Sequence, residues 1–85
     1  MIIVVNYLYR PKIKKLINLL KKNGFLFYET FSLENDKYGS PKNPNFLLKD
    51  RELLEIFGEE LIPLSFYDGK IKGKNISIKQ RASFK

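Results

Sequence analysis

The sequence predicts a single α/β domain, spanning residues 1–85, with a mixed four-stranded sheet. The first half of the chain reads as strand, helix and strand, and such a unit joins parallel strands through a right-handed crossover. The second half continues as helix, strand and strand. Asp68-Gly69 separates the last two strands and is a strong two-residue hairpin signal, so we expect those strands to be antiparallel. The predicted order is β-α-β followed by α-β-β.

Residues 2–9 predict the first strand, because the run opens with four β-branched or aliphatic residues and no polar alternation. A continuous apolar run is typical of a strand buried on both faces, so this strand should be central. Residues 11–23 predict a helix, with Pro11 in its first turn and Gly24 at its end. Its apolar residues recur at helical spacing: Ile13, Leu16, Ile17 and Leu20. Residues 25–31 predict the second strand.

The polar residues 34–45 predict a long loop. Asp50 should cap a short helix that runs through Phe57 and ends at Gly58. Leu53, Leu54 and Phe57 would face inward, while the acidic side chains of this stretch would face water.

Residues 61–67 predict the third strand, and residues 70–74 the fourth, joined at Asp68-Gly69. Residues 75–85 are weakly patterned. A truncated helix, an edge strand and a basic tail are all compatible with this stretch.

The net charge of +7 is concentrated at two ends of the sequence, around an acidic middle. Cations without acids occupy residues 10–22 and again residues 70–85. Such a distribution attracts anionic partners, but it also keeps a small domain soluble, and the sequence does not separate the two interpretations.

Several kinds of chemistry are excluded by composition. The chain has no cysteine, so it cannot form a disulfide, a thiolate metal site or a cysteine nucleophile. It has no histidine, which removes the usual zinc ligand and the usual general base near neutral pH. We therefore expect no catalytic residues, no cofactor and no metal. The longest apolar run is too short to span a bilayer, and cytoplasmic residence with no membrane partner is the expectation.

The junction between the first strand and the first helix carries Arg10-Pro11-Lys12-Ile13. In this setting the chain resembles the glutaredoxins of the thioredoxin superfamily, which place a Cys-Pro-x-Cys motif at this junction. Pro11 matches the family's proline, whereas Arg10 and Ile13 stand at the cysteine positions. The Lys-rich helix and the Asn23-Gly24 turn follow in the family's order. The resemblance implies a thioredoxin-like three-layer fold without redox activity.

Two later motifs extend the resemblance. Ile62-Pro63 looks like the dipeptide whose cis proline faces the active site, and residues 68–73 look like the hairpin and glycine that close the glutathione cleft. Lys74 stands where the family has a second glycine. Residues 52–69 are also similar to the arsenic-operon metallochaperones, whose arsenite-binding cysteines are absent here, so that activity does not transfer.

The resemblance implies one binding surface, which would gather residues that are distant in sequence: Tyr9, Arg10, Lys12, Ile62, Pro63, Lys72 and Lys74. The expected function is a redox-inactive binding module that docks a protein partner there. The alternative is a basic nucleic-acid or ribonucleoprotein accessory protein that uses the lysines on phosphate. A third possibility is a glutaredoxin-related enzyme that binds an anionic thiol such as glutathione. The aromatic residues of strand 25–31 could stack on single-stranded nucleic acid, although core packing is the more common use of aromatic strands.

Overall fold

The structure, a computed structural model, describes residues 1–20 and 24–85. The strands are β1 (Ile2–Val5), β2 (Leu26–Phe31), β3 (Pro63–Lys72) and β4 (Ile76–Phe84), and the α-helices are α1 (Lys15–Leu19) and α2 (Glu52–Phe57). Three short 3-10 helices join them: η1 (Arg10–Lys12), η2 (Leu33–Lys37) and η3 (Pro44–Phe46). The α/β class and the mixed four-stranded sheet are confirmed. No helix of the described residues is long and apolar enough to cross a membrane.

The sheet has the strand order β1-β2-β4-β3. β1 and β2 are parallel, and β4 pairs antiparallel with β2 on one side and β3 on the other. The prediction of a central first strand is therefore wrong. β1 lies at an edge, where Ile3 and Val5 are 61% and 48% exposed. It is also shorter than predicted, because Asn6 adopts a φ of 57° and ends the strand.

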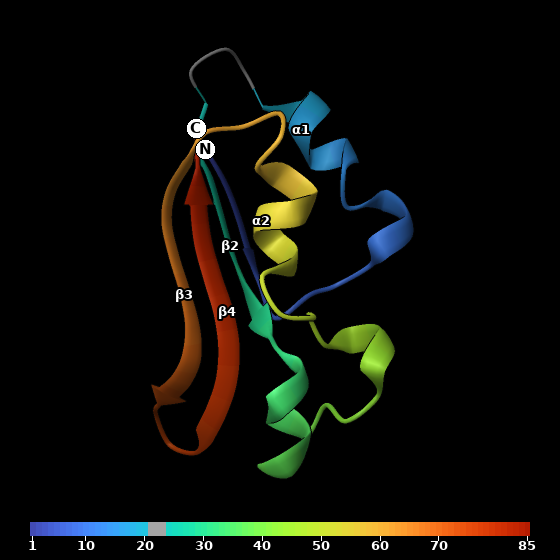
Figure 1. Cartoon of the computed structure of the whole chain (residues 1–85), viewed down its shortest axis with the longest axis vertical. Coiled ribbons are helices and arrows are strands. Elements are labelled where there is room, and N and C mark those ends of the chain that lie inside the picture. Colours follow the sequence, from blue (N-terminus) through green and yellow to red (C-terminus); the bar gives the residue numbers. More distant parts are fainter. Residues whose placement is uncertain (21–23) are drawn as a thin grey trace.

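All helical segments lie on one side of the sheet, to the right of the strands in Figure 1. On that side the sheet contributes Leu26, Tyr28, Ala82 and Phe84, each at most 1% exposed. Phe57 of α2 packs on the rings of Tyr28 and Phe84, with ring centroids 6.0 and 5.4 Å away. No helix of residues 1–20 and 24–85 covers the other face. The expected three-layer arrangement is thus corrected to two layers, one helical and one sheet.

The predicted helix over residues 11–23 is divided. η1 and α1 are separate short segments, and the predicted end at residues 21–23 lies outside the described residues. The apolar stripe nevertheless packs as expected, because Ile13 is in the core and Leu16, Ile17 and Leu20 lie against it. Pro11 sits in the first turn, as predicted, but of a 3-10 helix.

Helix α2 forms where it was predicted, with Gly58 at its C-terminus. Its N-terminus differs from the prediction. Arg51, with a φ of 58°, precedes the helix instead of an Asp50 cap, and the buried Gln80 side chain of β4 accepts from the Leu53 N–H at 2.8 Å. Gln80 also donates to the Lys49 carbonyl at 2.9 Å. A buried amide on the sheet therefore satisfies backbone groups at this helix start, which a local cap would otherwise do.

The hairpin prediction at Asp68-Gly69 is wrong, because both residues lie inside β3. The chain turns at residues 73–75, and residues 76–84, considered as a possible basic tail, form the central strand β4. The later turn has a clear physical advantage. It places a nine-residue strand beside β2 and buries Ile78, Ala82 and Phe84, whereas a turn at Gly69 would leave the centre of the sheet without that apolar strand.

The predicted loop over residues 34–45 is partly ordered into η2 and η3. Asn35 is 2% exposed, and its side chain accepts from the Ile78 N–H at 2.9 Å and donates to the Ser40 carbonyl at 3.4 Å. This amide attaches η2 to the start of β4 where β2 has already ended. The loop is thereby held against the lower end of the sheet in Figure 1.

Candidate nucleic-acid interface

Arg10, expected to present a cation to a partner, is bound within the chain. Its guanidinium donates to both carboxylate oxygens of Glu52, from Nε at 2.7 Å and from Nη2 at 2.8 Å. The remaining N–H groups donate to the carbonyls of Leu47 at 2.7 Å, Asn45 at 3.1 Å and Pro44 at 3.5 Å. All five donors of the guanidinium thus have acceptors on α2 and the segment before it.

The electrostatics of this cluster favour the charged pair. Burial alone would raise the pKa of Glu52, but hydrogen bonds from Arg10 and from the Lys49 N–H, together with the charge of Arg10, lower that pKa below its ordinary value of 4.5. The same carboxylate raises the pKa of Arg10. Glu52 was expected to face water and is instead 9% exposed. It is buried because it holds the arginine that joins the N-terminal segment to α2.

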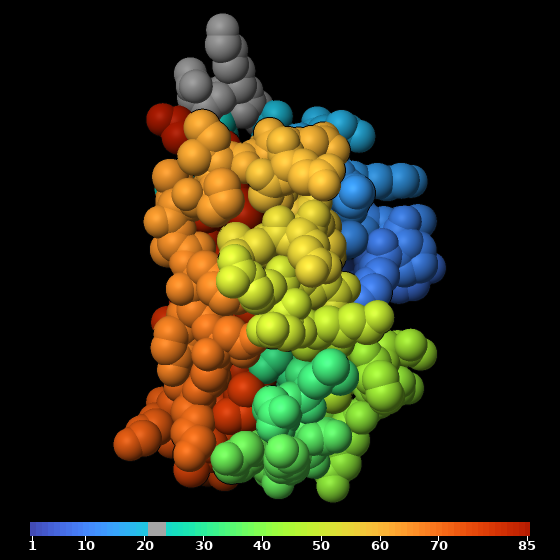
Figure 2. Space-filling model, in the orientation of Figure 1, coloured from blue at the N-terminus to red at the C-terminus, as the bar shows by residue number. Residues whose placement is uncertain are grey.

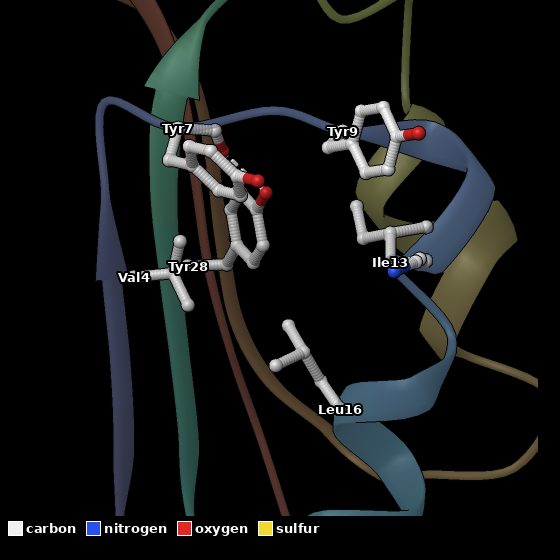
Figure 3. A pocket seen from close by; sticks show the side chains of 7 residues that line it. Val4, Tyr7, Tyr9, Ile13, Leu16 and Tyr28 are labelled. Atoms are coloured by element: carbon white, nitrogen blue, oxygen red, sulfur yellow. Dashed lines mark hydrogen bonds between the residues drawn. The ribbon is translucent and has the colours of Figure 1, made fainter.

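Tyr9 and Lys12 border a separate small cavity of about 110 Å³, between the β1–β2 pair and the segment η1–α1. Figure 3 shows Tyr7, Tyr28 and Tyr9 around it, with Ile13 and Leu16 from the helical side. Tyr28 donates a hydrogen bond to the Tyr7 carbonyl, and burial raises the pKa of Tyr28 to about 12. Such a cavity is too small for more than a few heavy atoms, so we do not assign it a ligand.

Ile62 and Pro63 lie at the other end of β3 from Lys72. Pro63 pairs with Phe84 while Lys72 pairs with Ile76, and the ten residues of the strand separate them by roughly 30 Å. The prediction that the seven site residues converge on one surface is therefore wrong, since β3 does not turn at Gly69. The expected cis bond at Pro63 is also wrong. The cis peptide bond of the described residues precedes Pro41.

A different surface brings aromatic and basic side chains together: the sheet face that the helices do not cover, here called the open face. Opposed residues of paired strands lie on the same face, so the register defines its rows. One row is Ile3, Phe27, Ser83 and Ser65, the next is Val5, Glu29, Arg81 and Tyr67, and the third is Phe31, Lys79 and Gly69. Phe27 and Phe31 are half-buried, and Tyr67 is 45% exposed. Phe25, which immediately precedes β2, is 36% exposed and continues the same aromatic line.

The cations of the open face surround a single carboxylate. Glu29 accepts from Arg81 at 2.6 Å and lies 3.7 Å from the Lys79 ammonium, and its side chain is 12% exposed. Lys79 also lies over the Phe31 ring, 4.8 Å from its centroid. The Arg81 side chain remains 42% exposed. Two cations oppose one carboxylate on this face, and part of the arginine is accessible to a further anion.

A groove of about 490 Å³ continues the open face where β2 ends and β4 begins. Phe31, Lys79 and Ser77 belong to both, and the remaining wall includes Tyr38, Asn35 and Asn75. Lys74 lies in the adjoining turn and is exposed. The groove therefore extends an aromatic and basic surface toward a lysine that was expected elsewhere in the site.

The sequence contains two signals for this surface. Phe27 and Phe31 were considered for stacking, and core packing was preferred for the strand. The alternation of β2 puts Leu26, Tyr28 and Thr30 in the core and the two phenylalanines on the opposite face. Lys79 and Arg81 were missed as partners of Phe31 and Glu29, because residues 75–85 had no assigned strand. Their alternation with Ile78, Gln80 and Ala82 was the available signal.

Neither the comparison with protein-family models nor that with curated proteins yields a match to this chain.

Proposed function

We propose that this chain is a non-catalytic binding module that holds single-stranded nucleic acid on the open face of its sheet. The observation that carries the proposal is that Arg81, whose side chain is 42% exposed, lies among aromatic rings on a sheet face that no helix of the described residues covers. Lys79 adds its charge beside the Phe31 ring, with a side chain that is only 12% exposed. Single-stranded nucleic acids are bound by aromatic side chains that stack on bases, beside cations that follow the phosphates.

The spacing of the aromatic side chains supports stacking. Phe27 and Phe31 lie four residues apart on β2, which corresponds to about 13 Å. Tyr67 lies two strands away from β2, on β3, at about 10 Å. An extended strand of nucleic acid could thus place bases on separate rings and its backbone over β4.

Fluorescence anisotropy with labelled single-stranded RNA and DNA of about 12 nucleotides would test the proposal, since a site of this kind covers roughly 4–16 nucleotides. We expect binding that weakens as salt is raised. Phe27→Leu and Phe31→Leu keep apolar bulk but remove the ring, and each should weaken binding about fivefold or more. Arg81→Gln can still donate to Glu29, and it should lower the salt dependence by about 0.7 in the log–log slope for one lost phosphate contact.

The matched control removes charge from the helical side. Lys14→Gln with Lys15→Gln deletes two exposed cations at the start of α1 and should leave affinity nearly unchanged. If this control lost as much affinity as the open-face variants, the net charge of the protein alone would account for nucleic-acid binding. No binding at low salt, or unchanged binding by both Phe→Leu variants, would refute the proposal.

A protein partner remains the second candidate, and the observation that favours it is the apolar end of the open face. Ile3 and Val5 are 61% and 48% exposed beside Phe27. An apolar docking surface should be nearly insensitive to salt, whereas phosphate contacts should not be. Ile3→Ser would weaken a protein complex and leave nucleic-acid affinity close to its original value.

The relation to glutaredoxins stays a proposal that this function does not require. The order of elements along the chain supports it, while the Pro63 peptide bond and the separation of Pro63 from Lys72 count against it. The non-catalytic part of the proposal rests on composition, because a chain without cysteine has no thiolate to carry out disulfide exchange.

A further inference from the structure

β3 is a long edge strand, and no strand of residues 1–20 and 24–85 pairs with its outer side. It is ten residues long, and nearly all of it is exposed, including Leu64 at 49% and Phe66 at 36%. Figure 2 shows it along the left flank of the molecule, with α2 beside it rather than over it. Exposed, apolar edge strands are templates for pairing with another strand, and proteins usually protect them.

The hydrogen bonds of β4 define which backbone groups of β3 point outward. The Ile78 N–H donates to Asn35 and its carbonyl accepts from the Ser32 N–H at 3.0 Å, so both groups point away from β3. Lys70 is opposite Ile78 and must therefore direct its own N–H and carbonyl to the free edge. By alternation, Asp68 and Lys72 do the same. Tyr67 agrees with this orientation, because its hydroxyl donates to the Lys70 carbonyl at 2.8 Å.

The sequence of β3 is complementary to itself when two copies run antiparallel with their Gly69 residues opposite each other. With a two-fold axis at Gly69, Asp68 is opposite Lys70 of the second copy, and the symmetry repeats this pair. The same register places Tyr67 against Ile71 on the open face, and Phe66 against the aliphatic part of Lys72 on the helical face. Moving the axis to Asp68 or to Lys70 would instead place that charge against itself.

We propose that two copies of this chain associate through their β3 edges, antiparallel about Gly69, to form one continuous eight-stranded sheet. The charge pattern selects this register, and the outward N–H and carbonyl groups of Asp68 and Lys70 form its central hydrogen bonds. This proposal does not depend on nucleic-acid binding. The dimer would, however, join the two open faces into one surface.

Tyr67 controls access to this edge. Its hydroxyl occupies the Lys70 carbonyl, which the second strand needs as an acceptor. Tyr67→Phe leaves the ring in place and frees that carbonyl. We expect the variant to dimerise several-fold more tightly than the original chain, while a dimer through any other surface would not change.

Sedimentation equilibrium over a concentration series would test the register with a charge exchange. Asp68→Lys or Lys70→Asp places like charges opposite each other twice and should weaken the dimer about tenfold or more. The double variant Asp68→Lys/Lys70→Asp restores opposite charges in this register and should recover most of the affinity. A double variant as weak as the singles, or an original chain that is monomeric up to millimolar concentration, would overturn the proposal.

Disulfide trapping is an independent measurement, because the chain has no cysteine of its own. Across the proposed axis the two Gly69 Cα atoms lie about 4.5 Å apart, within the range that a disulfide spans. Gly69→Cys should therefore cross-link on oxidation; the new Cβ meets the Tyr67 hydroxyl at 3.0 Å, a side-chain end that can turn away. The matched control Ile71→Cys lies about 13 Å from its symmetry mate and should not cross-link. Equal cross-linking of both variants would contradict the axis.

Discussion

Each side of the sheet contains one nearly buried carboxylate bound to arginine, and the two are used differently. Glu52, among the helices, and Glu29, on the open face, have side chains 11% and 12% exposed. Arg10 gives all five of its donors to Glu52 and neighbouring carbonyls. The Arg81 side chain is 42% exposed. Within the described residues, its guanidinium hydrogen-bonds to Glu29 alone.

Burial of the carboxylate therefore does not by itself reveal what the arginine does. Arg10 is saturated within the chain, so it stabilises one arrangement of η1, η3 and α2. Arg81 keeps accessible donors beside aromatic rings, so it can accept an anionic ligand without breaking its ion pair. We therefore expect variants among the helices to change stability, and variants on the open face to change binding.

The largest expected effect is on the core. Phe57→Ala should lower the free energy of unfolding by about 3–5 kcal/mol, because the ring is fully buried between Tyr28 and Phe84. Phe27→Ala on the open face should cost roughly 1 kcal/mol, since that ring is only half-buried. Urea unfolding of both variants measures the difference. Similar losses would mean that the open face is structural too.

The next effect concerns the two carboxylates. Glu52→Gln should destabilise the protein at pH 7 by about 2 kcal/mol, because it leaves Arg10 without its charge partner. Glu29→Gln should cost about 1 kcal/mol or less, because water can solvate the exposed part of Arg81. Thermal melts at low and high salt would check the order, and an equal cost would remove the distinction between the two sites.

Glu52 also predicts an acid dependence. Its pKa is lower in the folded state than in the unfolded chain, so the unfolded state binds the proton first as pH falls. The stability from this group is complete above the unfolded pKa, near 4.5, and is lost as pH falls through the folded value. Glu52→Gln should have a flatter stability profile below pH 5 or so than the original chain. Parallel profiles would contradict the prediction.

A further effect is alkaline. Burial raises the pKa of Tyr28 to about 12 in the folded protein from an ordinary value of 10.0. The unfolded state therefore loses the proton first, and stability should decline as pH rises from 10 to about 12. Tyr28→Phe lacks this group and should show a weaker decline, although it also loses the hydrogen bond to Tyr7. Chemical unfolding at pH 9 and pH 11 would measure it.

Local signals in the sequence correctly located several elements. Residues 25–31 form a strand within one residue of the prediction, and α2 ends at Gly58 as expected. The stripe of Ile13 and Leu16 packs on the core although the helix is divided. These features follow from periodicity and turn chemistry within a short window, and neighbouring residues alone are enough to express them.

The candidate site was less accessible to such reasoning. Arg10 and Glu52 are 42 positions apart, and Glu29 and Arg81 are 52 apart. In neither pair does the local sequence around one residue identify the other. The site expected at Lys72 and Pro63 failed for one reason, because it depended on a turn at Gly69, and one misplaced turn moves every residue beyond it.

The α/β class, the net positive charge, the lack of thiol chemistry and the aromatic second strand all follow from the sequence. Contacts between distant segments decide which strand is central, where the chain turns back and which face of β2 is left uncovered. The reason is energetic: Asp68-Gly69 and residues 73–75 are both acceptable turns, and the choice depends on burying Ile78, Ala82 and Phe84 against β2 and α2. That gain comes from contacts distant in sequence, and it outweighs the local preference at Gly69.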